Sequence, residues 1–133
     1  MSNVHPPTYP DGYDTEIFSF EALEKAWKKA ILPSEREHVT PFIWKNLSKE
    51  FTVKNVVYRI DYSKYRLTVD TPDDFKLISI ITEYFHDKWE DFYMDDVIKF
   101  LERNPELLKI NEQFKRDEGY TKSLVKDKQV QSE

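Results

Sequence analysis

Residues 68–75 read Thr-Val-Asp-Thr-Pro-Asp-Asp-Phe and join an expected strand to an expected helix. Apolar side chains at positions 65, 67 and 69 alternate with polar ones at positions 66, 68 and 70. That period of two is typical of a strand with one buried face. The sequence therefore predicts a strand that ends at Asp70.

The residues that follow Asp70 carry the signals of a helix start. Thr71 is a favourable N-cap, and Pro72 suits the first helical position. Asp73 and Asp74 then lie where the positive end of the helix dipole favours anions. Asp70 is accordingly expected at the carboxyl end of a strand, where open α/β sheets bind their ligands. Its alternative role is that of a turn or second capping residue.

Composition limits the classes of function. The 133-residue chain has a net charge of −5, which disfavours nucleic-acid binding through a basic surface. It has no cysteine, which excludes disulfides and thiolate chemistry and fits a reducing cytoplasm. Its apolar runs fall short of the roughly 20 residues that a membrane span needs. We therefore expect a soluble, cytoplasmic protein without nucleic-acid or membrane partners.

The sequence contains only two glycines, Gly12 and Gly119. Nucleoside triphosphates are usually bound by a glycine-rich turn whose backbone N–H groups approach the phosphates. No such turn occurs in this sequence, with or without a following lysine. The usual device for holding a triphosphate is therefore absent from it.

Hydrophobic periodicity predicts the elements of the first half. A strand is expected from Asp14 to Phe20. Ser19 can cap a helix from Phe20 to about Ile31, in which Trp27 is expected to be a core residue. Another helix is expected to begin at Ser34, after Pro33, and to continue through Ile43.

The second half is expected to contain a hairpin followed by helices. Strong alternation over Val56–Tyr62 predicts a strand that pairs with the one ending at Asp70 as an antiparallel hairpin. A helix from Pro72 to about Phe85 follows, and then a shorter one around residues 97–101. We expect one domain over residues 1–124, with a short mixed sheet and four to five helices. The charged residues 125–133 are expected to be disordered.

Three acidic residues besides Asp70 are candidate site residues. Asp14 and Glu16 would share one face of the expected strand, where carboxylates repel each other unless a cation, a sugar hydroxyl or solvent separates them. A solvated strand start is the alternative. Glu37 has the capping-box spacing to Ser34, so reciprocal capping competes with any binding role.

Three basic residues are candidates for binding anionic groups. Arg36 and His38 lie in the expected first turn of a helix, where they could bind a carboxylate or phosphate and exchange a proton near neutral pH. Exposure to solvent is their alternative. Arg66 shares a strand face with Asp70 and could meet a sugar carboxylate or phosphate, the alternative being cross-strand ion pairing.

Four stretches resemble one group of enzymes. Residues 68–75 are similar to the V-D-T-P-(D/E)-D-(F/L) motif of sugar cytidylyltransferases, which include the 3-deoxy-manno-octulosonate cytidylyltransferases. Residues 9–23 (Tyr-Pro-Asp-Gly-Tyr-Asp-Thr-Glu-Ile-Phe-Ser-Phe-Glu-Ala-Leu), 34–43 (Ser-Glu-Arg-Glu-His-Val-Thr-Pro-Phe-Ile) and 118–124 (Glu-Gly-Tyr-Thr-Lys-Ser-Leu) look like the cytidylyltransferase-like family of spore-coat polysaccharide biosynthesis protein F. The match follows the family's order over nearly the whole chain, but it covers only the C-terminal half of such a protein.

The resemblance implies a fold and a set of site residues. The fold would be the C-terminal part of a Rossmann-like, nucleotide-diphospho-sugar transferase-like domain, α/β in class and α+β as a fragment. The family's aspartate that matches Asp70 is a ligand of the catalytic Mg²⁺, so Asp70 is the expected catalytic and metal-binding residue. The expected substrate-binding residues are Asp11, Asp14, Glu16, Arg36, Glu37, His38 and Arg66.

The implied reaction joins CTP and a sugar to give a CMP-sugar and pyrophosphate, in the synthesis of surface or spore-coat polysaccharide. The family's triphosphate loop precedes anything that this chain contains. We therefore expect that the chain lacks the N-terminal triphosphate-binding half and is inactive alone. Its expected partners are CTP and a sugar in the complete enzyme, together with the missing half or a second copy. The alternative is a non-catalytic dimerisation or interaction module derived from such an enzyme.

Overall fold

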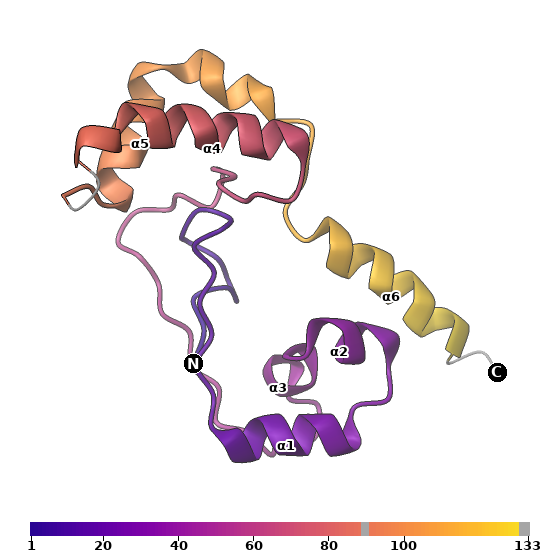
Figure 1. Ribbon diagram of the computed structural model, residues 1–133. Helices are drawn as coiled ribbons and strands as arrows, with labels where there is room; N and C mark the ends of the chain where they lie inside the picture. The colour runs from indigo at the N-terminus through magenta and orange to yellow at the C-terminus, as the bar shows by residue number, and fades with distance from the viewer. Residues whose placement is uncertain (89–90, 131–133) are drawn as a thin grey trace. The chain divides into compact units, whose positions relative to one another are not determined.

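The computed structural model describes residues 1–88 and 91–130 (Figure 1). They form two compact units, each built from segments that lie far apart in the sequence. Unit 1 contains Met1–Pro7, Thr15–Tyr58 and the segment that begins at Asp117, and unit 2 contains Thr8–Asp14 and Arg59–Arg116. The single domain expected over residues 1–124 stays a prediction.

The predicted hairpin is not formed. The described residues contain helices and isolated backbone bridges but no strand, and Figure 1 accordingly draws no arrow. In unit 2 the Asp11 N–H donates to the Tyr65 carbonyl at 2.9 Å, and the Leu67 N–H donates to the Asp11 carbonyl at 2.8 Å. Because these backbone groups are already paired with the N-terminal segment, residues 56–62 cannot form a ladder with them.

The strand expected from Asp14 to Phe20 is wrong as well. Within that range Glu16 alone forms a bridge, with Ser2. The capping prediction is confirmed, because Ser19 Oγ accepts a hydrogen bond from the Ala22 N–H at 3.2 Å and begins a helix. Ser19 therefore ends the extended segment, because it is the N-cap of the helix that follows.

Unit 2 is built from two α-helices and two short 3₁₀ helices. They are α4 (Pro72–Tyr84), η1 (His86–Lys88), α5 (Met94–Arg103) and η2 (Pro105–Ile110). The predicted N-cap of α4 is confirmed, because Thr71 Oγ1 accepts from the Asp74 N–H at 3.1 Å. The core of the unit consists of Tyr65, Leu67, Leu77, Ile81, Phe85, Val97, Ile98 and Leu101.

Unit 1 contains four helices among its described residues: α1 (Phe20–Lys29), α2 (Pro33–His38), α3 (Pro41–Lys45) and α6 (Glu118–Val130). The single helix expected from Ser34 to Ile43 is divided in two at Val39. Val39 has φ of 65°, which a right-handed helix does not allow. Pro41 then starts α3 at the position where its missing N–H is harmless.

Helix α6 occupies part of the tail that we expected to be disordered. Residues 125–130 lie in its last two turns, and residues 131–133 lie outside the described part of the chain. Two of its side chains, Ser123 and Asp127, are buried against α2. The charged sequence of α6 gives no apolar pattern to mark it, because this helix docks through polar groups.

None of the helices in the described ranges combines the length and the apolar character that a membrane span requires.

The turn at Gly12 connects the N-terminal segment to the rest of unit 2. The Tyr13 N–H donates to the Pro10 carbonyl at 3.1 Å, and Gly12 has φ of 100°. A Cβ atom at this position would lie 2.3 Å from the Leu67 carbonyl oxygen. Both the backbone conformation and the close approach therefore require glycine.

We expect Gly12→Ala to destabilise unit 2 by about 2 to 3 kcal/mol, because the variant combines a backbone conformation unfavourable to alanine with a contact against backbone. Urea unfolding and faster amide hydrogen exchange in the α4 and α5 peptides would measure this loss. Gly119→Ala is the matched control, since its Cβ would have no contact closer than 3.7 Å, to His38. Equal losses of stability in the two variants would contradict the requirement for glycine at position 12.

Candidate functional site

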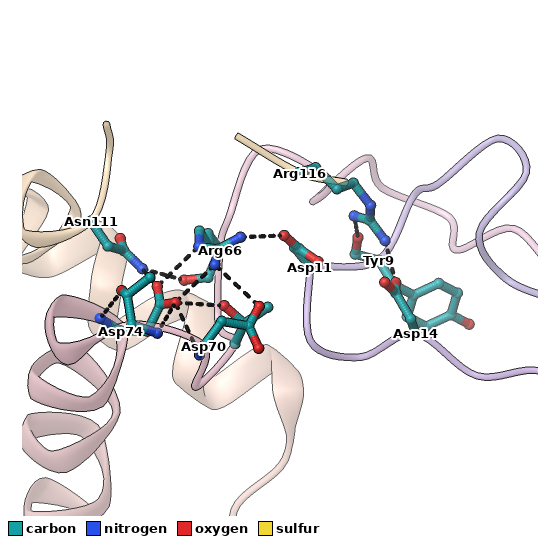
Figure 2. Close-up of polar contacts among 10 residues, drawn as sticks. Tyr9, Asp11, Asp14, Arg66, Asp70, Asp74, Asn111 and Arg116 are labelled. Atoms are coloured by element: carbon teal, nitrogen blue, oxygen red, sulfur yellow. Dashed lines mark hydrogen bonds and ion pairs between the residues drawn. The ribbon is translucent and has the colours of Figure 1, made fainter. Parts of the chain in front are cut away.

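Arg66 is the centre of the polar cluster in unit 2 (Figure 2). Its Nε and Nη2 donate to the two carboxylate oxygens of Asp74 at 3.0 and 2.8 Å. Nη1 donates to Asp11 Oδ2 at 3.1 Å, and Nη2 also reaches Asp70 Oδ2 at 3.3 Å. One guanidinium therefore holds three carboxylates, which come from the N-terminal segment, the end of the extended stretch and α4.

Asp74 is the buried member of this cluster, with no exposed surface. Besides Arg66, its carboxylate accepts hydrogen bonds from Thr68 Oγ1 at 3.0 Å and from Asn111 Nδ2 at 2.8 Å. It also accepts from the backbone N–H groups of Asp70 and Thr71, each at 3.2 Å. Burial alone raises the pKa of Asp74, but the hydrogen bonds from Arg66, Asn111 and Thr68 outweigh it and hold the pKa well below the usual range.

Asp70 presents most of its carboxylate to solvent, with 71% of its side chain exposed. Its hydrogen bond from Arg66 is the longest in the cluster. Its backbone N–H is fixed by Asp74. The structure therefore places Asp70 as an exposed carboxylate on a backbone that the buried network holds in position.

A second arginine supports the N-terminal segment beside this cluster. Arg116 Nη1 donates to the Tyr9 carbonyl at 3.2 Å, and Nη2 forms an ion pair with Asp14 (Figure 2). Asp11 and Asp14 are thus both held by arginines, from either side of the Gly12 turn. The predicted site residues Asp11, Asp14, Arg66 and Asp70 all lie in unit 2.

The other predicted site residues, Glu16, Arg36, Glu37 and His38, lie in unit 1. Glu37 and His38 meet at Ser123 of α6. Ser123 Oγ donates to Glu37 Oε2 at 2.7 Å, and His38 Nε2 lies 3.0 Å from the same hydroxyl. Because the single hydroxyl proton of Ser123 is donated to Glu37, the Ser123 oxygen acts as an acceptor toward His38, and the His38 Nε2–H is the donor. Hydrogen bonds from Ser123 and Lys126 lower the pKa of Glu37.

The capping box predicted for Ser34 and Glu37 is wrong. Ser34 lies inside α2, where its N–H and Oγ–H both donate to the Asp127 carboxylate, at 2.8 and 2.6 Å. Helix α6 therefore supplies the anion at the N-terminal end of α2. Arg36 Nη1 donates to the Trp27 carbonyl at 2.7 Å. This hydrogen bond satisfies one of the backbone carbonyls that the last turn of α1 leaves without a partner inside the helix. The Trp27 side chain itself is 67% exposed, which corrects the prediction that Trp27 is a core residue.

The carboxylates of unit 2 decide whether a divalent cation fits this site. Among the described residues, no three side chains of metal-binding types come together as a ligand set. Mg²⁺ in enzymes commonly takes one or two carboxylates and completes its octahedron with water and substrate phosphates. Asp70 fits this pattern as a single exposed ligand, while Asp11 and Asp74 are committed to Arg66.

Sequence reasoning missed residues that position the others. Asp74 could have been found, because it stands three residues after an N-cap threonine, at the capping-box position. Asn111, Arg116 and Asp127 are isolated polar residues in charged segments and carry no local signal, and Ser123 lies in the 118–124 motif without a predicted role. Their partners lie 37 to 107 residues away in the chain.

The chain matches no model of a known protein family. It resembles a solved cytidylyltransferase from Leptospira borgpetersenii serovar Hardjo-bovis, with 34% identity and a TM-score of 0.71 over 80% of this chain and 44% of that one. It is also 41% identical over 102 residues to an uncharacterized protein of Methanocaldococcus jannaschii, covering 75% of this chain and 41% of the relative. The chain spans less than half the length of each relative, and over that part it is cytidylyltransferase-like.

We expect Asp74→Asn to destabilise the protein by about 3 kcal/mol, because it leaves Arg66 without its buried partner. In the wild type the pKa of Asp74 is lower when folded than when unfolded. Its contribution is therefore present above the unfolded pKa of about 4 and is lost as the pH falls toward the folded value.

Urea unfolding at pH 7 and at pH 3 would measure both effects. The difference between wild type and Asp74→Asn should shrink at the lower pH. Asp73→Asn is the control, because its hydrogen bond to Gln113 is exposed. A difference that stays constant with pH would contradict the role assigned to the Asp74 charge.

We expect Asp127→Ala to release α6 from α2, because two donors of the buried Ser34 then lose their acceptor. Limited proteolysis should cleave α6 much faster in this variant than in wild type. Val125→Ala changes an exposed residue of the same helix and should leave the cleavage rate unchanged. Equal protection of both variants would show that Asp127 does not hold α6.

Proposed function

We propose that the chain provides part of a cytidylyltransferase that transfers a cytidylyl group from CTP to a sugar. The observation that supports this proposal is the exposed carboxylate of Asp70, mounted on a rigid buried network in a chain with a cytidylyltransferase-like fold. The reaction class is attack of a sugar oxygen on the α-phosphorus of CTP, with release of pyrophosphate. Such a reaction depends mainly on positioning and on neutralisation of phosphate charge.

Asp70 is the proposed ligand of Mg²⁺. The chemistry that Mg²⁺ supplies when bound is neutralisation of charge on the phosphates. Arg66 keeps the Asp70 backbone in place through Asp74 and limits the directions in which the Asp70 carboxylate points. In this proposal Arg66 acts chiefly by positioning, since four of its five N–H groups are already directed to carboxylates.

The sugar-binding role falls to residues near Asp70 in unit 2. Asp11 and Asp14 flank the Gly12 turn, and their arginine partners fix the carboxylates as acceptors for sugar hydroxyls. For Glu16, Arg36, Glu37 and His38 of unit 1, substrate binding is a proposal carried by the family motif. In that motif His38 can donate to a substrate through Nδ1 only when the imidazole is protonated, because its Nε2–H is used by Ser123.

The sequence does not contain the glycine-rich turn that usually binds a triphosphate. With Gly12 in a tight turn and Gly119 in α6, neither glycine provides a phosphate-binding loop. We propose that the chain alone has no transferase activity and that the remaining part of a cytidylyltransferase must supply the triphosphate site. The finer assignment, to the spore-coat polysaccharide biosynthesis protein F family acting in the cytoplasm on a surface-polysaccharide sugar, rests on the motifs of residues 9–23, 34–43 and 118–124.

A second candidate function is a non-catalytic interaction module. The observation that favours it is that no three metal-binding side chains come together among the described residues, and that Asp11 and Asp74 both pair with Arg66. A module of this kind would keep the Asp70 network as a folding element. The two functions differ in whether the Asp70 carboxylate matters once the triphosphate site is supplied.

The test is complementation in trans. The wild-type chain is mixed with the portion of the Leptospira cytidylyltransferase that it does not match, and pyrophosphate release from CTP, Mg²⁺ and sugar acceptors is measured. We expect no release from the chain alone and release from the mixture. Asp70→Asn should lower the rate at least about 100-fold by removing a metal ligand.

Asp73→Asn, three residues away and outside the cluster, is the matched control and should retain activity. Calorimetry of CTP and Mg²⁺ with the chain alone should show weak binding or none. An active mixture that tolerates Asp70→Asn would favour the module. If the chain alone binds CTP and Asp70→Asn abolishes that binding, the proposal that the triphosphate site is supplied by another part of the enzyme is contradicted.

A further inference from the structure

Ser123 on α6 is a buried hydroxyl that contacts three polar groups of unit 1. Its Oγ lies 2.7 Å from Glu37 Oε2, 3.0 Å from His38 Nε2 and 3.2 Å from the Gly119 carbonyl oxygen. The exposed fraction of Ser123 is 1%. Because water hardly reaches this hydroxyl, these three groups set its hydrogen-bond pattern.

Two of the three groups can only accept a hydrogen bond. The hydrogen bonds from Ser123 and Lys126 lower the pKa of Glu37, so its carboxylate is ionised at neutral pH. The Gly119 carbonyl has no proton to donate. The Ser123 proton therefore goes to one of these oxygens, and the charge-assisted bond to Glu37 is the shorter one. The Ser123 oxygen then accepts the Nε2–H of His38.

The neighbouring residues of α6 fix the orientation of the His38 ring. The Tyr120 ring packs edge-on against the imidazole, with ring centroids 5.4 Å apart and an angle of 86° between the planes. A Cβ atom on Gly119 would lie 3.7 Å from His38 Cε1, so the helix backbone runs close beside the ring. A rotation that exchanged the two ring nitrogens would break the hydrogen bond to Ser123 and disturb this packing.

The other ring nitrogen of His38, Nδ1, is open to a ligand. Because Nε2 carries the proton, Nδ1 of the neutral imidazole carries a lone pair and acts only as an acceptor. In the described part of the chain Nδ1 has no hydrogen-bond partner, and Arg116 Nε is the one buried side-chain polar atom there that lacks a partner. His38 Nδ1 is therefore accessible to solvent.

A lone pair in this position selects the chemistry of the ligand group that it binds. A hydroxyl can donate to Nδ1, whereas the oxygens of a carboxylate or phosphate ion present only lone pairs of their own. A metal ion would need further ligands, and no three metal-binding side chains come together among the residues that the structure describes. The neutral His38 side chain is thus suited to a hydroxyl group.

We propose that Ser123 is a positioning residue that holds His38 as the Nε2–H tautomer, so that Nδ1 accepts a hydrogen bond from a hydroxyl group of the ligand. The identity of this ligand as the sugar of a cytidylyl transfer rests on the proposed function. The tautomer and the open Nδ1 do not rest on it, because they follow from contacts within unit 1.

Alkylation of the full chain with iodoacetamide at pH 8 tests the tautomer without any substrate. Only an unprotonated ring nitrogen attacks this reagent, and a free imidazole, with a pKa of about 6.5, is neutral at pH 8. The chain has no cysteine that would compete for the reagent. Hydrolysis of the isolated His38 peptide then separates Nδ1-carboxymethyl from Nε2-carboxymethyl histidine. We expect the Nδ1 product in the wild type and both products in Ser123→Ala, where Nε2 has lost its acceptor.

The controls for the labelling are a second variant and a second histidine. Thr121→Ala removes an exposed hydroxyl from the same helix and should keep the wild-type pattern. The exposed His5, whose ring packs on Trp44, should give both products in every variant. Circular dichroism would establish that each variant keeps the helical content of the wild type.

Three labelling results would overturn the role of Ser123. The first is an Nε2 product on wild-type His38. The second is a wild-type His38 that stays unlabelled while His5 reacts, which would mean that Nδ1 is closed. The third is an Nδ1 product alone in Ser123→Ala, which would mean that packing against Tyr120 fixes the ring without the hydroxyl.

The ligand of Nδ1 is tested in the mixture with the remaining portion of the Leptospira cytidylyltransferase. Ser123→Ala and His38→Gln should each raise the KM for the sugar acceptor about tenfold, as expected for the loss of one hydrogen bond, and leave the KM for CTP unchanged. A merely structural defect would not separate the two substrates in this way. Thr121→Ala should keep both KM values.

An active mixture in which both variants keep the wild-type KM for the sugar would overturn the binding role of His38. A mixture that is inactive even with the wild-type chain would reject the proposed function, and with it the sugar as the ligand. The labelling pattern decides the tautomer by itself, so the two failures are distinguishable.

Discussion

The ion pair between Arg66 and Asp74 is the constraint on which unit 2 depends. An unpaired charge in a buried position costs several kcal/mol, so each partner requires the other. Asp74 connects the start of α4 to Thr68, Asn111 and the backbone of Asp70. Arg66 extends the same connection to Asp11. The exposed Asp70 carboxylate acquires a defined position from neighbours that are themselves largely buried.

The same constraint places an exposed carboxylate next to a buried one. In the proposed function the Asp70 carboxylate stays accessible to a cation, whereas the buried Asp74 carboxylate anchors the start of α4. Asp70 and Asp74, four residues apart, divide these tasks. In unit 1, Ser123 and Asp127 of α6 likewise hold α2 through groups that solvent does not reach.

Local signals in the sequence predicted the local features. Ser19 and Thr71 cap their helices as expected, and the core of α5 follows the expected spacing. The hairpin was wrong because the choice of backbone partner for residues 65–67 depends on Asp11, which is more than 50 residues away. Asp70 is a predicted site residue because of its place before a capped helix, and that role stays a prediction, whereas Asn111 and Asp127 act at a distance that no spacing rule describes.

The interleaved composition of the two units has a consequence for synthesis on the ribosome. Unit 2 is complete once Arg116 has been translated, because its two segments end there. Unit 1 needs Ser123 and Asp127, which are translated after Arg116, to hold α2. The nascent chain can therefore assemble unit 2 before unit 1, and α2 lacks its anchor until Asp127 has been translated.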